Sequence, residues 1–224
     1  MDTSATDTPE ITVVPTTAIP EPVRKQVLAL FHASYRDAVD AYLEQSFSKL
    51  HYLAVATASD GTLAGFALGD LRIVDLPRLP QQPVAFAGIC CIHERFRRHG
   101  LFRELERRCF LASGTDWRPR VLSCGRMAHP VSFRTMLDNP TRVPKPGIPP
   151  TPWQKEIGAA VAAIYGVKEF DPDTFVCRGR GTPMSCVIDV DVAPEKWEVF
   201  APVDRTRGDS LLGMIWVPDA PEGW

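Results

Sequence analysis

The residues best suited to chemistry lie in the segment 93–102, which holds three arginines and one glycine. The apolar run Val84–Ile92 predicts a strand buried on both faces before it, and the amphipathic pattern over 100–112 predicts a helix after it. The first turn of a helix carries N–H groups without internal acceptors and partial positive charge, so it attracts anions. Gly100 has no Cβ and lets a phosphate approach the backbone closely. The charged side chains around it are Arg95, Arg97, Arg98 and His99.

Two simpler interpretations of this segment stay open. It could be a solvated link in which Gly100 is an ordinary turn residue, or the arginine-rich turn of an unrelated α/β protein that contacts nucleic acid. The chain has 25 basic and 27 acidic residues and a net charge of −2, which argues against a surface built for nucleic acid or an anionic membrane. Aromatic residues are not interleaved with the arginines, as stacking on bases would require. We therefore expect no nucleic acid and no membrane as partner.

The pattern Arg97-x-x-Gly100-x-Phe102 resembles the GNAT superfamily of N-acetyltransferases, in which Arg/Gln-x-x-Gly-x-Gly/Ala follows the fourth strand. The match holds at the first two fixed positions and departs at the third, where Phe102 should crowd the loop. About 15 residues carry the motif, while the order of elements matches over roughly 10–140. The resemblance implies an α/β layered fold, with a mixed, mostly antiparallel central sheet flanked by helices.

The resemblance also implies acetyl-CoA, or another acyl-CoA, as co-substrate. In such proteins the fourth strand splays from the fifth, and the pantetheine arm fills the gap like an added strand. In this chain the strand residues that would bind it are Cys90, Cys91, Ile92 and His93. Backbone amides from Arg97 to Phe102 would hold the pyrophosphate, with Arg98, His99, Gly100 and Leu101 between them.

The implied reaction is acyl transfer to an amine of a small molecule or protein, by direct attack in a ternary complex. Only about one lysine-like amine in two thousand is neutral at pH 7, so a base or a desolvating pocket matters. The strand Val84–Ile92 contains no acid. By element position the nearest candidates are Asp70 and Glu44, although a strand-end polar residue and a solvated helix residue are the simpler interpretations.

The family's leaving-group acid is usually a Tyr seven residues after an Asn. Aligning His129 with that Asn places Met136 at the Tyr position, and methionine has no proton to donate. His129 is then a substitute candidate, with a cap as the simpler role. A catalytically degenerate GNAT-like protein that binds acyl-CoA or regulates is the alternative function.

The six cysteines show no Cys-x-x-Cys pair, so we expect no metal site and free thiols in a reducing, cytoplasmic compartment. Cys90 and Cys91 are adjacent on a strand and should point to opposite faces. Either could be a nucleophile, but a buried core thiol is the simpler interpretation. The first nine residues lack the basic and apolar regions of a secretory signal.

Periodicity and turn residues predict the remaining elements. The clearest is a hairpin, in which the strand from Leu50 to Thr57 and the strand Leu63–Ile73 flank the turn Asp60-Gly61. Pro77–Pro83 is expected to be a loop. Further strands are expected at Ile11–Val14 and Val121–Cys124, and helices from Glu21, over Arg36–Phe47 and over His129–Leu137.

Residues 139–152 contain six prolines, which predict an extended loop. A helix over Pro152–Tyr165 and strands at Thr174–Arg178, Ser185–Val192 and Ser210–Val217 should follow. The last strand either completes this chain's own sheet or forms a dimer edge, so a monomer and a homodimer both stay open. We expect a disordered tail over 1–9 and one domain over 10–224, with a cofactor-binding core at 10–140 and an elaboration at 141–224.

Overall fold

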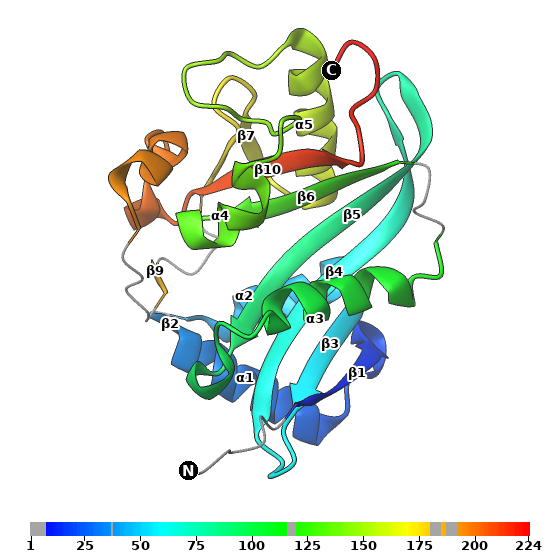
Figure 1. Ribbon diagram of the computed structural model, residues 1–224, viewed down its shortest axis with the longest axis vertical. Coiled ribbons are helices and arrows are strands. Elements are labelled where there is room, and N and C mark those ends of the chain that lie inside the picture. Colours follow the sequence, from blue (N-terminus) through cyan, green and yellow to red (C-terminus); the bar gives the residue numbers. More distant parts are fainter. Residues whose placement is uncertain (1–7, 37, 116–119, 180–184, 187–191) are drawn as a thin grey trace, which may run out of the picture.

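The computed structural model describes residues 8–36, 38–115, 120–179, 185–186 and 192–224. An eight-stranded sheet in the order β1-β3-β4-β5-β6-β10-β8-β7 forms its centre (Figure 1). The strands in that order are Glu10–Pro15, Tyr52–Thr57, Leu63–Leu76, Leu79–Ile92, Val121–Met127, Ser210–Val217, Val176–Arg178 and Glu169–Asp171. Among these neighbours β5 and β6 are parallel and the other pairs antiparallel. The expected mixed, mostly antiparallel fold class is confirmed.

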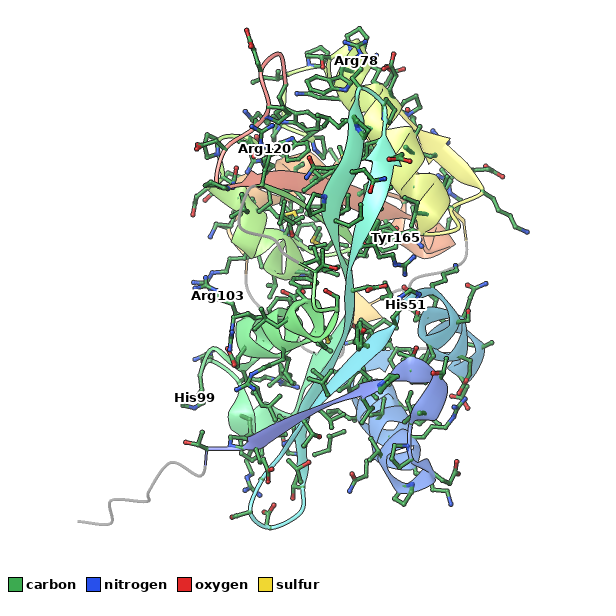
Figure 2. All side chains as sticks on the ribbon, turned by 90° about the vertical axis from the view of Figure 1, so that its right-hand side faces the viewer. His51, Arg78, His99, Arg103, Arg120 and Tyr165 are labelled. Carbon is green, nitrogen blue, oxygen red and sulfur yellow. The ribbon has the colours of Figure 1, made fainter. Side chains whose placement is uncertain are left out.

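Helices cover both faces of the sheet. They are α1 (Glu21–Ser34), α2 (Asp40–Lys49), α3 (Leu101–Ala112), α4 (Pro130–Leu137) and α5 (Pro152–Ile164). Figure 2 shows the green helices α3 and α4 on one face and the blue helices α1 and α2, with the yellow α5, on the other. The main core lies between the sheet and α1, α2, α4 and α5, and a second cluster lies under α3. None of the helices described is long and apolar enough to cross a membrane.

The predicted hairpin is confirmed. Gly61 adopts φ +80° in the turn and donates from its N–H to the carbonyl of Ala58 at 2.9 Å. The long strands β4 and β5 then form a second hairpin, so the prediction of a loop over Pro77–Pro83 is wrong. Prolines are tolerated there because β5 pairs with β6 only from Val84 onward, and the missing N–H groups break no ladder on that side.

Helix α2 begins four residues later than predicted. Tyr35–Arg36 forms strand β2 instead, paired with β9 (Ser185–Cys186). Of the strand predicted over 185–192, residues 185–186 form β9. Residues 187–191 lie outside the described residues, and residue 192 is not in a strand. The other helices begin within one residue of their predicted starts. Thr151 accepts from the Gln154 N–H in a capping box ahead of α5, and His129 accepts from the Val131 N–H ahead of α4.

The C-terminal strand completes this chain's own sheet. β10 spans Ser210–Val217 as predicted and lies antiparallel to both β6 and β8. The proline-rich segment forms no helix or extended strand over 139–151, as expected, and is joined to the sheet by two 2.9 Å backbone hydrogen bonds between Val143 and Met214. Residues 141–224 therefore contribute strands to the central sheet. The tail expected over 1–9 falls mostly outside the described residues.

Candidate functional site

The two parallel strands separate in the middle of the sheet. β5 and β6 pair from Val84 and Leu122 to Ala87 and Gly125, and no described strand pairs with β5 on that side beyond Ala87. The fork expected from the family resemblance is therefore present. We call the opening between β5 and β6 beyond Ala87 and Gly125 the fork.

The hydrogen-bond pattern shows which peptide groups of β5 face the fork. The His93 N–H donates to the carbonyl of Ala64 at 2.9 Å, on β4's side. Because hydrogen bonding alternates along antiparallel strands, the peptide groups of Cys91 also face β4, while those of Cys90 and Ile92 face the fork. Of the four strand residues predicted to bind pantetheine, Cys90 and Ile92 thus present backbone groups to the opening.

A bulge lies at the apex of the fork. Ala67 pairs with Cys90 and Gly69 with Ala87, so Gly88 and Ile89 oppose the single residue Leu68. A Cβ at Gly88 would lie 2.3 Å from Leu50 Cδ1 and 3.0 Å from the backbone oxygen of Leu68. Only glycine fits there without displacing its neighbours.

A cavity of about 140 Å³ runs through the fork, large enough for a reacting group rather than a single water. Its lining comes from both faces of the sheet: α3 and α4 contribute on one side and α2 on the other. Lining residues from the two strands include Ala87, Gly88, Ile89, Cys90, Ser123, Gly125 and Arg126. The cavity therefore connects the two faces at the place where the sheet opens.

One face of α3 supplies an acid to this cavity. Phe102, Glu106 and Phe110 follow one another at intervals of four residues, so they share a face, and all three line the cavity. Burial raises the pKa of Glu106 from 4.5 to about 7. Glu106 is the single carboxylate among the described lining residues, and it exchanges its proton near neutral pH. Glu106 was not among the residues predicted from the sequence, although its position four residues after Phe102 and four residues before Phe110 was an available signal.

The turn before α3 has free backbone donors. Gly100 adopts φ +77° at the N-cap, Arg98 adopts φ +70°, and no side chain caps the helix. Within the described part of the chain, the N–H groups of Arg98, His99 and Gly100 have no acceptor, and a Cβ at Gly100 would touch nothing within 4 Å. The exposed side chains of Arg98 and His99 have no partner there either. Figure 2 shows His99 and Arg103 on the α3 side of the sheet.

Two residues of the motif, Arg97 and Phe102, differ from the expectation of a free amide at Arg97 and of a loop crowded by Phe102. The Arg97 N–H donates to the carbonyl of Glu94 at 3.3 Å, and its Nε donates to the carbonyl of Ile92 at 3.0 Å. Arg97 therefore fixes the turn against the end of β5, and its own amide is already occupied. Phe102 lines the cavity without closing it, and Leu101 is the first residue of α3.

The predicted acids lie outside the cavity lining. The Glu44 carboxylate is paired with Arg24. Asp70 is 1% exposed and accepts from Arg72 and, at 2.9 Å, from His51, which Figure 2 labels on the α2 side. Their catalytic roles stay predictions that these contacts do not favour.

His129 and Met136 do line the cavity. The His129 Nδ1 accepts from the Val131 N–H at 3.2 Å, and its ring packs edge-on against Trp197. Met136 is buried against Gly125 and Gly213. The position that the alignment gave to a proton donor therefore faces the fork but is apolar.

The two adjacent cysteines pack on opposite faces of β5, as expected. Cys90 joins the cluster under α3, and Cys91 joins the main core. Burial, the larger cause, and the nearby Glu106 carboxylate raise the pKa of Cys90 well above its ordinary value. A thiol held in its protonated form is a poor nucleophile, so Cys90 is a wall of the cavity.

No family model and no curated protein matches this chain. Solved structures do. A GNAT family N-acetyltransferase (YhbS) from Escherichia coli, in complex with CoA, is 18% identical at a TM-score of 0.42, over 61% of this chain and 72% of that one. A GNAT family acetyltransferase from Elizabethkingia anophelis with acetyl-CoA bound is 15% identical at a TM-score of 0.37, over 56% and 72%.

A third similar structure is the aminoglycoside 6'-N-acetyltransferase AAC(6')-Ih from Acinetobacter baumannii. It is 19% identical at a TM-score of 0.34, over 44% of this chain and 68% of that one. The first two of these structures are named as GNAT family proteins.

Proposed function

We propose that this chain is an acyltransferase of the GNAT type, which moves an acetyl or other acyl group from acyl-CoA to an amine. The observation that carries the proposal is the fork between β5 and β6, because the cavity running through it connects unpaired backbone groups to a titratable carboxylate. A fork lined only by apolar side chains would bind acyl-CoA but would offer no group that exchanges a proton.

The residues of the fork fit a CoA thioester. The free N–H groups of Arg98, His99 and Gly100 and the uncapped first turn of α3 would hold the pyrophosphate, with the Arg98 side chain adding charge. The peptide groups of Cys90 and Ile92 would pair with the amides of the pantetheine arm, as an added strand does. The Ile92 carbonyl already accepts from Arg97, which leaves the Ile92 N–H and both Cys90 groups for this purpose.

The bound thioester supplies an activated acyl carbon. In the proposed reaction the amine nitrogen bonds to that carbon and the carbon–sulfur bond breaks, so one proton must leave nitrogen and one must reach sulfur. Glu106 as carboxylate takes the proton from the amine, and Glu106 as carboxylic acid returns it to the thiolate. Its pKa of about 7 suits both directions at neutral pH.

His129 stays a second proposed contributor, because its ring lies at the α4 side of the same cavity. Asp70 and Glu44 are proposed only to support the structure around the cavity, since both carboxylates are held in ion pairs away from its lining. A reducing cytoplasm is proposed as the site of action on the basis of five free cysteines among the described residues.

The second candidate function is binding of acyl-CoA without transfer. Met136 favours it, because an apolar side chain fills the place where the aligned Tyr would donate a proton. Glu106 favours transfer, because it supplies a proton-exchanging group in the same cavity.

Calorimetry with CoA and acetyl-CoA, followed by thiol release from acetyl-CoA across a panel of amines, separates these functions. A ligand at 100 times its Kd should add about 2.7 kcal/mol to the free energy of unfolding. Binding with thiol release supports the transferase, whereas binding without release by any amine supports the binding protein. Absence of binding by CoA, acetyl-CoA and longer acyl-CoAs would overturn both.

A further inference from the structure

Positive charge gathers in the part of the cavity that faces away from α3. Lys49 at the end of α2 and Arg126 on β6 line this part, while Arg205 at the start of η4 (Arg205–Arg207) lines the same cavity beside Trp197 and His129, on the α4 side. Successive side chains of a strand point to opposite faces of the sheet. The positions of Gly125 and Met127 on β6 face Met136 of α4, so the Arg126 side chain between them points to the other face. This is the face covered by α1, α2 and α5 in Figure 2. We call Lys49 and Arg126 the cationic wall.

The cationic wall has no carboxylate partner in the described part of the chain. Arg126 places Nε and Nη2 3.2 Å from the hydroxyl of Ser210, a neutral acceptor. Arg205 stacks over the Trp197 ring at 5.2 Å, and its buried Nε has no hydrogen-bond partner. Lys49 makes no ion pair with a described residue. Burial, and second the charge of Arg126, lower the pKa of Lys49.

Nearby acids are already neutralised by other cations. Glu44 is paired with Arg24, and Asp70 with Arg72. Asp209, which is fully buried, accepts from Arg207 at 2.7 Å. The remaining carboxylate of the described lining, Glu106, comes from α3 on the other face. Two like charges brought together under partial burial cost free energy, and a bound anion would remove that cost.

We infer that the acceptor is an amine that carries its own anionic group, a carboxylate or a phosphate, held by the cationic wall. This inference rests on the proposed function. The anion would sit against Lys49 and Arg126 while the amine reaches the fork, where Glu106 lies. Tyr35, Tyr42 and Leu50 line the same side and offer aromatic and apolar surface to the acceptor's body. Polycationic amines would meet like charge at this wall and bind poorly.

The test compares amines that differ in one anionic group. Phenylalanine is measured against phenylalaninamide, and phosphoethanolamine against ethanolamine, with spermidine as the polycation. Binding to the full chain with CoA present is followed by calorimetry, and transfer is followed by thiol release. We expect each anionic probe to bind at least about tenfold more tightly than its neutral partner, since a charge-assisted contact has roughly that effect. Preference for phenylalanine marks a carboxylate site, and preference for phosphoethanolamine marks a phosphate site.

The variants Lys49→Gln and Arg126→Gln should each reduce this preference about tenfold or more, while Arg126→Lys should keep most of it. Lys25→Gln is the matched control, because Lys25 is an exposed lysine of α1 outside the cavity and should leave every value unchanged. Thermal melts identify a variant that fails to fold, and Lys49→Gln, which breaks no ion pair with a described residue, then decides alone.

The outcomes separate this inference from the proposed function. Acyl transfer with equal or better use of phenylalaninamide, ethanolamine or spermidine overturns the anionic acceptor and leaves the transferase standing. Binding of the anionic probes that depends on Lys49, in a protein that binds no CoA, supports the cationic wall and overturns the transferase. An anionic preference that survives Lys49→Gln and Arg126→Gln in folded protein overturns the assignment to this wall.

Discussion

The hydroxyl of Tyr165 lies 2.9 Å from the carbonyl oxygen of Ala87, the last residue at which β5 still pairs with β6. The same hydroxyl lies 3.0 Å from the carbonyl oxygen of Cys124 on β6. Tyr165 follows α5 and is buried, and Figure 2 shows it between that helix and the sheet. One phenol thus bridges both strands at the point where they begin to diverge, from a segment that the sequence assigned to an elaboration.

Replacing Tyr165 by phenylalanine should loosen the apex of the fork. The two carbonyls lose their shared donor, so we expect the free energy of unfolding to fall by about 1–3 kcal/mol and CoA affinity to fall several-fold. Denaturant unfolding and calorimetry measure both. Tyr52→Phe is the control, because no described residue bonds to the Tyr52 hydroxyl. Unchanged stability and affinity in Tyr165→Phe would contradict the bridging role.

Glu106→Gln should reduce acyl transfer without removing CoA binding. The amide cannot accept the amine proton, so kcat should fall about 10²–10⁴-fold. In the parent protein kcat/KM should rise with pH through about 7, the pKa of Glu106, and this rise should vanish in the variant. Glu104→Gln is the matched control, since Glu104 pairs with Arg107 and Arg108 outside the cavity. A full rate in Glu106→Gln would assign proton transfer to another group.

The same residue should make stability depend on pH. Because the pKa of Glu106 is about 7 in the folded chain against 4.5 ordinarily, the folded state binds more protons between those values. Its contribution to stability is present below pH 4.5 and is lost as the pH rises through 7. We expect Glu106→Gln to exceed the parent in free energy of unfolding by about 1–3 kcal/mol at pH 8 and by little at pH 5. Equal differences at both values would contradict the raised pKa.

Gly100→Asp should weaken CoA binding while keeping the fold. An aspartate at the N-cap accepts from the first turn of α3 and suits its dipole, so it stabilises the helix and repels a pyrophosphate. The left-handed φ of +77° costs a non-glycine residue about 1 kcal/mol, which aspartate and asparagine tolerate best. Gly100→Asn therefore controls for backbone strain. We expect calorimetry to show a loss of at least about tenfold for Asp beyond that for Asn.

Gly88→Ala should damage the bulge at the apex of the fork. The added Cβ would lie 2.3 Å from Leu50 Cδ1 and 3.0 Å from the Leu68 backbone, so strand β5 must shift. Overpacking of this kind costs about 1–3 kcal/mol, measurable by denaturant unfolding. The comparison variant is Gly125→Ala, whose nearest contact is the flexible end of Met127 at 3.3 Å. A smaller loss in Gly88→Ala than in Gly125→Ala would contradict this account.

Local features of the sequence were enough to predict the segment from β5 to α3. An apolar run, a glycine without a Cβ and an amphipathic periodicity each act over short distances, and the structure ends β5 at Ile92 as predicted and begins α3 directly after Gly100. The loop predicted at Pro77–Pro83 failed because the tolerance of proline there depends on where β6 begins to pair, which is a tertiary fact.

The raised pKa of Glu106 and the gathering of distant cationic side chains at the cavity could not be predicted in this way. The pKa of Glu106 depends on how α3 lies against the sheet, since burial is its cause. Lys49, Arg126 and Arg205 are far apart in the sequence and meet only through the fold. The sequence instead favoured Asp70, whose carboxylate is satisfied by Arg72 and His51.

Because residues of α3 line the cavity on one face of the sheet and residues of α2 line it on the other, the proposed acyltransferase would hold acyl-CoA and the amine on opposite sides of β5 and β6. Under that proposal both substrates would be bound together when the acyl group moves, and no acyl group would be carried on the polypeptide itself.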